Sequence, residues 1–556
     1  MKKITLLILM ISSLMVGQSF QLVKDENPSD AGLNMNCSFR EMNGKLYYLF
    51  SGESTLGNIA LYTSDGTAAG TYRISPSNVS VSDNIIISGN KIYFFATDGI
   101  NGKEPWISDG TLAGTHLLKN IHPTTVDNNF ETSSVRFLSA DATKAFFIAN
   151  DGTTGYELWV TDGTEAGTNL VLDIFQGSNG SQIQVAPSAI GNNMKDGKLY
   201  FFALNGSGSS TINGIEPWVS DGTPSGTFML KDINSSPFNG STGTAYSKHF
   251  IEYNGKMYFY AIGSTAASFA IYETDGTTEG TVLFKSLERV DEFIVKDNLL
   301  YFTCVNGPSV WTSDGTLTGT NQIATIPNGQ LNNVATCQMT IANNELFFRV
   351  ISSSVGSELF KLNSSNELIN VKDIWSGSSN GVNSNIFQDR KILQVYDNKV
   401  WFLGTDGSSA GAMQVWNSDG TTDGTVSLTP LSGGGWAGGN GNNYNLFATS
   451  FGVFIIYVHP QTGGELYFYT NNPLDNPSFE GNSGVVVYPN PSNGNFTIQA
   501  PDGFIGSNAI VYNLFGQSIK AFSIDDANQN VNLEKGVYLL QIQKGNQVFT
   551  KKIVIH

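Results

Sequence analysis

The stretch Glu157-Leu-Trp-Val-Thr-Asp-Gly-Thr-Glu-Ala-Gly-Thr168 decides the fold, because its second half recurs along the chain. The pattern Asp-Gly-Thr-x-x-Gly-Thr is found seven times, each time with an aromatic residue three positions before the Asp. Two further segments, Glu358-Leu-Phe360 and Glu465-Leu-Tyr467, keep the aromatic residue but lose the turn. The nine aromatic residues are 39 to 59 residues apart, a period typical of solenoids, propellers and other repeat proteins.

The aromatic residue and the Asp define the repeat motif. The copies with a tryptophan pair Trp106 with Asp109, Trp159 with Asp162, Trp218 with Asp221, Trp311 with Asp314, and Trp416 with Asp419. The remaining two pair Tyr62 with Asp65 and Tyr272 with Asp275.

The composition favours many short strands joined by turns. Of the 556 residues, 60 are Gly, 12% are aromatic and only 14% are charged, which indicates an all-β protein. The 30 Lys and Arg against 47 Asp and Glu give a net charge of −17. No basic run is interleaved with aromatic residues, so nucleic acid is not an expected partner.

Each period contains four short apolar segments of strand length. Asn-Gly or Asp-Gly, as at Asn254-Gly255, precedes several of the second segments, and such dipeptides are typical of two-residue hairpin turns. A Gly-, Ser- and Asn-rich passage follows the fourth segment and is long enough to cross a four-stranded sheet. Four-stranded sheets repeated radially make a β-propeller, which we expect over residues 20–470.

The two ends of the repeat region complement each other. The last period ends near Tyr467 to Tyr469 without a fourth segment, while Gln21-Leu-Val-Lys-Asp-Glu-Asn-Pro28 resembles the fourth segment Phe228-Met-Leu-Lys-Asp-Ile-Asn234. We therefore expect the N-terminal strand to complete the last sheet and close the ring. The prediction is eight or nine blades, depending on whether the worn repeats near Phe347 and Phe454 form full blades.

The chain ends outside the repeats have their own signatures. Residues 1–19 combine Lys2-Lys3 with an apolar run too short to span a membrane, which predicts a cleaved export signal and no transmembrane segment in the mature chain. Residues 471–484, rich in Asn and Pro, are predicted to be a linker. From residue 485 to 556, alternating apolar segments and Gly/Asn turns predict a small C-terminal β-sandwich.

This C-terminal module resembles the type A sorting domain of type IX secretion. The resemblance rests on Tyr488, Pro489, Asn490, Pro491, Gly516, Gly536, Lys551 and Lys552. It implies that the type IX secretion machinery is a partner, that the protein crosses the outer membrane of a Gram-negative bacterium, and that the domain is removed as the protein is released or attached to the surface. The repeat itself resembles the ELWxxDGT repeat family, which implies a similar location and has no established activity to carry over.

The recurring motif residues are expected to form the fold, because a ring with one active site does not need seven copies of it. No catalytic motif and no metal-ligand spacing among the five His residues is present, so no catalytic residue, metal or cofactor is predicted. Calcium at the turns is the alternative. One carboxylate per turn is too few for it, unless a crossover residue such as Asp173 or Asp232 adds a second.

Function is expected in the crossover passages, where the repeats differ. Trp375, Trp436 and Tyr444 are candidate ligand contacts, since aromatic rings beside Asn can stack on a sugar. The alternative is that they pack between blades. The sequence thus predicts an exported binding or adhesion module for a glycan or a surface protein. The rivals are a polysaccharide-active enzyme, which requires two acids about 5–9.5 Å apart, and a purely structural surface component.

Overall fold

The computed structural model describes residues 20–24, 38–50, 59–82, 84–122, 135–185, 193–207, 210–233, 250–262, 269–287, 290–304, 309–325, 339–382, 391–408, 413–428, 445–459, 463–471, 485–490, 492–501, 504–513, 518–544 and 547–556. These residues form strands and turns without an α-helix, so the all-β prediction is confirmed. Within the same ranges, no helix has the length and hydropathy needed to span a bilayer. The expected export signal and nearly all of the expected linker lie outside the described residues.

The chain forms two compact units, which we describe separately. The first comprises residues up to Tyr469 except Gly66–Ala69, and the second comprises those four residues and Thr470–His556. The described part of the first unit contains nine sheets of four or five strands, which we number along the chain.

Sheets 1 to 3 come first in the chain. Sheet 1 contains β2 (Phe39–Met42), β3 (Lys45–Phe50), β4 (Ala60–Ser64) and β5 (Tyr72–Arg73). Sheet 2 contains β6 (Ser80–Val81), β7 (Ile86–Ser88), β8 (Lys91–Thr97), β9 (Glu104–Ser108) and β10 (His116–Leu117). Sheet 3 contains β11 (Arg136–Ala140), β12 (Ala145–Asn150), β13 (Tyr156–Thr161) and β14 (Asn169–Leu172).

Sheets 4 to 6 follow. Sheet 4 contains β15 (Phe175–Gln176), β16 (Met194–Lys195), β17 (Lys198–Ser207), β18 (Ser210–Ser220) and β19 (Phe228–Met229). Sheet 5 contains β20 (Phe250–Tyr253), β21 (Lys256–Ile262), β22 (Phe269–Thr274) and β23 (Val282–Ser286). Sheet 6 contains β24 (Val290–Lys296), β25 (Leu299–Cys304), β26 (Ser309–Ser313) and β27 (Asn321–Thr325).

The last three sheets include both worn repeats, each of which forms four strands. Sheet 7 contains β28 (Met339–Ala342), β29 (Glu345–Ser352), β30 (Gly356–Leu362) and β31 (Leu368–Lys372). Sheet 8 contains β32 (Gln394–Tyr396), β33 (Lys399–Gly404), β34 (Gln414–Ser418) and β35 (Val426–Leu428). Sheet 9 contains β36 (Asn445–Ala448), β37 (Val453–His459), β38 (Gly463–Tyr469) and β1 (Gln21–Lys24).

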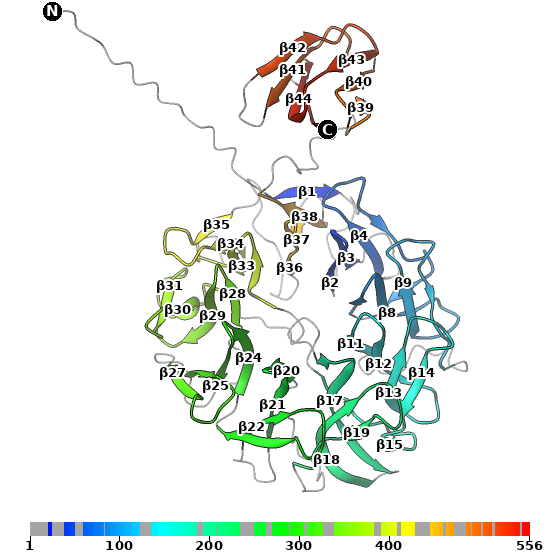
Figure 1. The fold of residues 1–556 in the computed structure, drawn as a ribbon, viewed down its shortest axis with the longest axis vertical. Coiled ribbons are helices and arrows are strands. Elements are labelled where there is room, and N and C mark those ends of the chain that lie inside the picture. The colour runs from blue at the N-terminus through cyan, green and yellow to red at the C-terminus, as the bar shows by residue number, and fades with distance from the viewer. Residues whose placement is uncertain are drawn as a thin grey trace, which may run out of the picture. The chain divides into compact units, whose positions relative to one another are not determined.

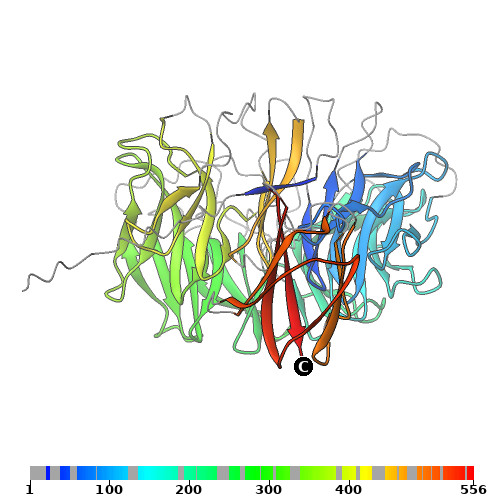
Figure 2. The same ribbon diagram turned by 90° about the horizontal axis from the view of Figure 1, so that it is seen from above.

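The hydrophobic core of the first unit lies between the sheets. Among the described residues, nine clusters of buried side chains each join two consecutive sheets, and one of them joins sheet 9 to sheet 1. In this closing cluster, Val23 and Phe454 of sheet 9 pack with Tyr48 of sheet 1. The nine sheets therefore follow one another around a closed circle, with β20 and β24 on its inner side and β14 and β27 on its outer side (Figure 1). Seen from the edge, the strands run across the thickness of the ring (Figure 2).

The N-terminal strand closes the ring as the sequence predicts. Strand β1 pairs antiparallel with β38, with Gln21 opposite Phe468 and Leu22 opposite Tyr467. The Lys24 ammonium donates to the backbone carbonyl of Thr71 in sheet 1, 3.3 Å away. The outermost strand of sheet 9 thus comes from the start of the described chain, and it also contacts sheet 1.

The outer strands are shorter than the sequence pattern predicts. The segment from His116 to Ile121 is predicted to be one strand, but β10 ends at Leu117. The amide of Ile121 donates to the buried side chain of Glu104 in the neighbouring strand β9, at 2.9 Å. The Glu104 carboxylate thus holds the backbone a few residues after β10 has ended.

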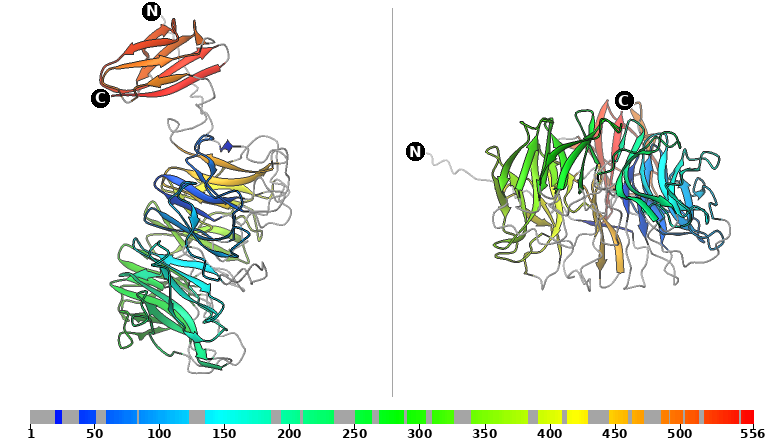
Figure 3. Two further views of the ribbon diagram at one scale, coloured as in Figure 1. Left: turned by 90° about the vertical axis from the view of Figure 1, so that its right-hand side faces the viewer. Right: turned by 90° about the horizontal axis from the view of Figure 1, so that it is seen from below.

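The second unit is the predicted β-sandwich (Figure 3). One sheet contains β39 (Val486–Tyr488), β40 (Asn495–Gln499) and β43 (Asn528–Asn532). The other contains β42 (Ser518–Ser523), β41 (Asn508–Asn513), β44 (Gly536–Lys544) and β45 (Gln547–Ile555). Side chains from both sheets, including Phe496, Ile498, Val511 and Leu540, form one buried core.

Candidate functional site

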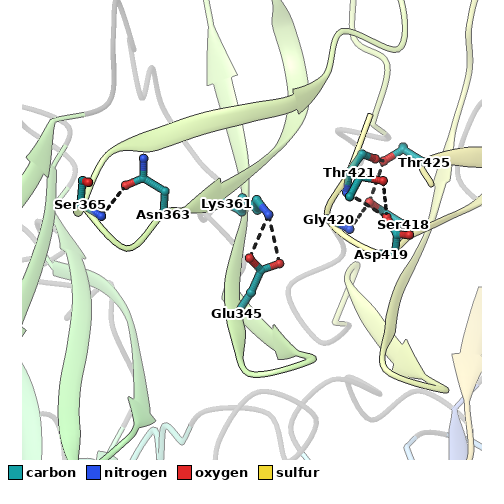
Figure 4. Close-up of polar contacts among 9 residues, drawn as sticks. All are labelled: Glu345, Lys361, Asn363, Ser365, Ser418, Asp419, Gly420, Thr421 and Thr425. Atoms are coloured by element: carbon teal, nitrogen blue, oxygen red, sulfur yellow. Dashed lines mark hydrogen bonds and ion pairs between the residues drawn. The ribbon is translucent and has the colours of Figure 1, made fainter. Parts of the chain in front are cut away.

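The repeated turn is held together by its own side chains, as the copy at Asp419 shows (Figure 4). Thr421 donates its amide and its hydroxyl to Oδ1 of Asp419, at 2.9 and 2.7 Å. The Thr421 hydroxyl accepts from the Gly424 amide at 2.9 Å. The Thr425 hydroxyl donates to the Thr421 carbonyl at 2.6 Å and lies 2.7 Å from the Ser418 hydroxyl. The two Thr residues and the Asp of the motif are therefore engaged within the turn.

The two glycines of the turn are needed for different reasons. Gly420 has a φ of 89°, a conformation that side chains other than glycine rarely adopt. At Gly424 the obstacle is the Asp419 carboxylate, because a Cβ there would lie 2.0 Å from its Oδ1. In the other six copies, a Cβ at the equivalent glycine would lie within 2.2 Å of the turn Asp: Gly70, Gly114, Gly167, Gly226, Gly280 and Gly319.

The turn carboxylates are exposed but already act as acceptors. Hydrogen bonds from the hydroxyl and amide of Thr164 hold the pKa of Asp162 below its usual range. Within the described ranges, no three His, Cys, Asp or Glu side chains gather at one point. Calcium at these turns stays a prediction, and the equivalent crossover Asp373 accepts instead from the amide of Gly377 in its own loop, at 3.3 Å.

Six of the seven repeated turns, all but the one at Asp65, are seen to contact the preceding sheet at their first glycine. A Cβ on Gly276 of sheet 5 would lie 2.7 Å from the hydroxyl of Tyr200 in sheet 4. A Cβ on Gly420 would lie 2.6 Å from Glu345, which forms an ion pair with Lys361 in sheet 7 (Figure 4). The motif therefore positions neighbouring sheets against each other as well as reversing the chain.

Lysines add a second contact between sheets. The ammonium group of a Lys near the outer strand donates to the carbonyl of the last Thr in the next sheet's turn. The distances are 3.3 Å for Lys24 to Thr71, 2.6 Å for Lys119 to Thr168, 3.1 Å for Lys231 to Thr281, 3.3 Å for Lys285 to Thr320 and 2.8 Å for Lys372 to Thr425. These five lysines, each in or just after the outermost strand of its sheet, thus belong to the frame of the ring.

These contacts predict how much stability is lost when a turn glycine is replaced by alanine. Gly276→Ala combines a φ of 91° with the close Tyr200 hydroxyl, whereas Gly255→Ala has a φ of 75° and no atom within 4 Å of the added Cβ. We expect Gly255→Ala to lower the unfolding free energy by about 1 kcal/mol, and Gly276→Ala to lower it by about 1–2 kcal/mol more. Denaturant titration of the two variants measures the difference. Equal losses would show that the turn has no steric role against sheet 4.

The Glu of the motif is buried and ties two segments of the chain together. Glu104, Glu157, Glu216, Glu358 and Glu465 are all 0–2% exposed. The carboxylate of Glu157 accepts from the amides of Ile174 and Phe175, both at 3.1 Å, and Glu104 accepts from the amides of Ile121 and His122, both at 2.9 Å. These Glu residues therefore fix the beginning of the crossover passage to the third strand of the sheet.

Burial dominates the titration of these carboxyl groups. It raises the pKa of Glu104 to about 7 and the pKa of Glu157 and of Glu358 to about 8, although hydrogen bonds from the crossover amides act to lower each value. The tryptophans of the motif are buried too in four copies, Trp106, Trp159, Trp218 and Trp416, and Trp311 is half-buried. The motif side chains face the frame, so a ligand site requires other residues.

Of the predicted ligand contacts, only Trp375 lies within the described residues; Trp436 and Tyr444 lie outside them. Trp375 is half-buried, and its amide donates to Oε1 of Glu358 at 3.3 Å. A Cβ on Gly407 of the neighbouring sheet region would lie 2.6 Å from the indole Nε1. The indole thus lies against Gly407, which favours the packing alternative for this residue.

The residues of the C-terminal motif are distributed over the sandwich. Tyr488 is exposed at the end of β39 and precedes Pro489 through a cis peptide bond. Oδ1 of Asn490 accepts from the amide of Val554 at 2.9 Å, which ties the start of the unit to its last strand. Gly536 begins β44, and Lys551 and Lys552 lie in β45. Pro491 and Gly516 lie outside the described residues.

One cavity contains residues that the sequence analysis did not single out. It measures about 170 Å³ and is lined by Ile251 of β20, Glu292 and its neighbours in β24, Met339 of β28, and Lys391, which precedes β32. Oε2 of Glu292, which is 8% exposed, accepts from the amide of Met339 at 2.7 Å. Burial lowers the pKa of Lys391, while the nearby Glu292 carboxylate acts to raise it. No motif or spacing in the sequence marks Glu292 and Lys391, so sequence reasoning had no signal that could have found them.

These features define an all-β protein with a ring of sheets and a C-terminal β-sandwich. Residues 486–556 match the secretion system C-terminal sorting domain. The predicted sorting domain is thus confirmed over nearly the whole module, and this finding supports handling by type IX secretion and a secreted or cell-surface location. A comparison with curated proteins found no match.

Solved structures with a partly similar course of the chain include peptidases and a lyase. A prolyl endopeptidase is 12% identical, with a TM-score of 0.37, and the similarity covers 69% of this chain and 54% of that one. A puromycin-hydrolyzing peptidase of Mycobacterium tuberculosis is 10% identical with a TM-score of 0.38, over 80% and 61%. An oligogalacturonate lyase in complex with manganese is 10% identical with a TM-score of 0.30, over 55% and 82%. The chain spans less than two thirds of either peptidase, and no activity is transferred to it at these scores.

Proposed function

We propose that residues 20–470 are a nine-bladed β-propeller of ELWxxDGT repeats, exported by type IX secretion, that acts as a binding or adhesion module for glycans or surface proteins. The observation that carries this proposal is the closed cycle of nine core clusters, the last of which joins sheet 9 to sheet 1. Radial repetition leaves only short, protected sheet edges, and β1 covers the edge of β38 in sheet 9, which favours a stable and soluble surface module.

The use of the recurring side chains supports binding rather than repeated catalysis. The turn Asp and Thr residues hydrogen-bond within the turn, the buried Glu residues hold the crossover passages, and the outer-strand lysines join neighbouring blades. What remains for recognition is the set of side chains in which the blades differ. The rigid frame then presents these differing residues from several blades at fixed positions.

Export is tested by fractionating cells of a host that has type IX secretion. The full-length chain is expected in the medium or on the outer surface, and a variant lacking residues 486–556 is expected to remain inside the outer membrane. A full-length variant with Ile519→Ser, at an exposed position of β42 (Ser518–Ser523) in the same domain, is the control and is expected to be exported like the wild type. Export of the variant without residues 486–556 would contradict the assigned route.

Binding is tested with the exported protein on a glycan array and on whole cells. Saturable binding to a glycan or to a cell-surface protein is the expected result. Folded protein that binds neither would contradict the proposal and favour a structural role. Release of new sugar ends from a polysaccharide would instead indicate the enzyme alternative.

A further inference from the structure

Two buried polar atoms of sheet 8 have no hydrogen-bond partner in the part of the chain that the structure describes. They are Nε1 of the Trp416 indole and Oε1 of the Gln414 amide, whose side chains are 5% and 8% exposed. Trp416 packs with residues of sheet 7 in the core cluster between the two sheets. Because Gln414 is two positions earlier in β34, both side chains lie on the same face of the strand. A buried donor and a buried acceptor on one face indicate a bound molecule that pairs with both.

The equivalent tryptophan of sheet 6 shows which contact Trp416 lacks. Trp311 donates its Nε1 to the hydroxyl of Ser309, two positions earlier in the same strand, at 3.0 Å. The indole N–H in this strand is thus directed toward the residue two positions earlier, which in sheet 8 is Gln414. Oε1 of Gln414 can accept such a bond, but it does not pair with the indole.

Two other copies separate the sheet 8 arrangement from the general repeat. Nε1 of Trp159 and of Trp218 also lacks a partner among the described residues. The residue two positions earlier is Glu157 or Glu216 there, and its carboxylate accepts from crossover amides. In sheet 8, by contrast, the acceptor beside the indole is unpaired as well. The place beside Trp416 therefore offers both a donor and an acceptor.

Sheet 8 also departs from the repeat on the strand that faces Gln414. In sheets 2, 3 and 4, the residue that faces the motif Glu across the second and third strands is an alanine: Ala96, Ala149 and Ala203. In sheet 8 the facing pair is Gly404 and Gln414. The two differences remove a methyl group and replace a carboxylate by a neutral amide.

Gly404 brings a third polar group to the same place. A Cβ on Gly404 would lie 3.4 Å from Nε1 of Trp416 and 2.5 Å from the carbonyl oxygen of Gly381. Both atoms therefore lie around one point beside Gly404. The Gly381 carbonyl accepts from the Thr405 amide at 2.8 Å and has a second lone pair. One donor and two acceptors thus converge between sheets 7 and 8.

These three groups select the chemistry of the bound molecule. A cation would face the indole N–H, and an anion would face two oxygen atoms, so neither suits the whole set. A neutral molecule that accepts one hydrogen bond and donates two suits it. Because the side chains are buried, the molecule must be small. Water meets both conditions, and buried water typically makes about three hydrogen bonds to polar groups that otherwise lack a partner.

We propose that one ordered water molecule is bound here, accepting from Nε1 of Trp416 and donating to Oε1 of Gln414 and to the carbonyl oxygen of Gly381. Gly381 belongs to the crossover passage that also carries Trp375, and Oε1 of Glu358 accepts from the amides of both residues. The water adds a contact between this passage and the third strand of the next sheet. It is part of the frame that positions Trp375.

A crystal structure of the exported protein, at a resolution that shows ordered water, tests the site directly. The expected result is a density peak about 2.7–3.2 Å from each of the three atoms. In Gln414→Ser, Nε1 of Trp416 is expected to donate directly to the introduced hydroxyl, as Trp311 donates to Ser309. The proposal fails if the wild type has no peak within hydrogen-bond distance of Trp416 and Gln414, or if these two side chains bond directly to each other.

A measurement in solution tests the same site without crystals. Magnetic relaxation dispersion of the solvent deuterons counts the long-lived internal waters. The double variant Trp416→Phe with Gln414→Met removes the donor and one acceptor, so the count is expected to fall by about one. Trp311→Phe with Ser309→Ala, which removes a direct bond, is the matched control and is expected to leave the count unchanged.

An unchanged count in the folded Trp416 and Gln414 double variant would contradict the water site. An equal fall in the control would contradict it too, because the loss would then follow from removing any indole of the motif. If the double variant does not fold, the crystal structure of the wild type decides the question alone.

Discussion

Val23→Asp is expected to lower the unfolding free energy of the ring by about 3–5 kcal/mol, because it places a carboxylate in the cluster that closes the circle. Val23 is 6% exposed and packs with residues of both sheet 9 and sheet 1. The substitution removes apolar contacts at the one interface whose two sides come from opposite ends of the unit. Thermal and urea unfolding of the purified protein would measure the loss.

Leu22→Asp is the matched control for this prediction. Leu22 lies in the same strand, beside Val23, but is 42% exposed. A surface substitution of this kind is expected to change the unfolding free energy by less than about 0.5 kcal/mol. If both variants unfold like the wild type, strand β1 contributes nothing to the closure of the ring.

The closure shows how far the sequence could predict the fold. The likeness of the segment after Gln21 to the fourth segment at Phe228 places a strand with its sheet although the two are far apart in the chain. Periodicity and turn dipeptides likewise predict four strands per repeat. The exact end of the fourth strand could not be predicted, because it depends on the Glu104 side chain in the neighbouring strand, and no local pattern shows that contact.

The candidate site was less predictable than the fold. Glu292 and Lys391 belong to different sheets and share no motif, so their proximity requires the ring geometry that brings β24 and the start of sheet 8 to one cavity. At Gly424 the sequence marks a recurring glycine, but only the structure shows that the side chain of Asp419 leaves no room for a Cβ there.

Glu157→Gln is expected to lower the unfolding free energy by about 1–3 kcal/mol at pH 5, because an amide nitrogen would face one of two buried amides that need an acceptor. The carboxyl group of Glu157 accepts from both Ile174 and Phe175, whereas a carboxamide offers only one oxygen. Glu165→Gln, at an exposed position of the turn in the same sheet, is the control and should leave stability unchanged. If Glu157→Gln is as stable as Glu165→Gln, the carboxyl group of Glu157 does not hold the crossover passage in place.

The same pair of variants tests the direction of the pH dependence. Burial raises the pKa of Glu157 to about 8 in the folded protein, above the ordinary value of 4.5 expected when the chain is unfolded. The neutral carboxyl group therefore stabilises the fold fully below pH 4.5, and this contribution is lost as the pH rises towards 8. The unfolding free energy of the wild type should fall between pH 4.5 and 8. The unfolding free energy of Glu157→Gln should fall less, because the variant lacks the contribution of this one carboxyl group. The opposite result is an unfolding free energy that rises with pH in the wild type but not in Glu157→Gln. It would mean that the hydrogen bonds from the Ile174 and Phe175 amides lower the pKa of Glu157 more than burial raises it, so that the carboxylate stays charged.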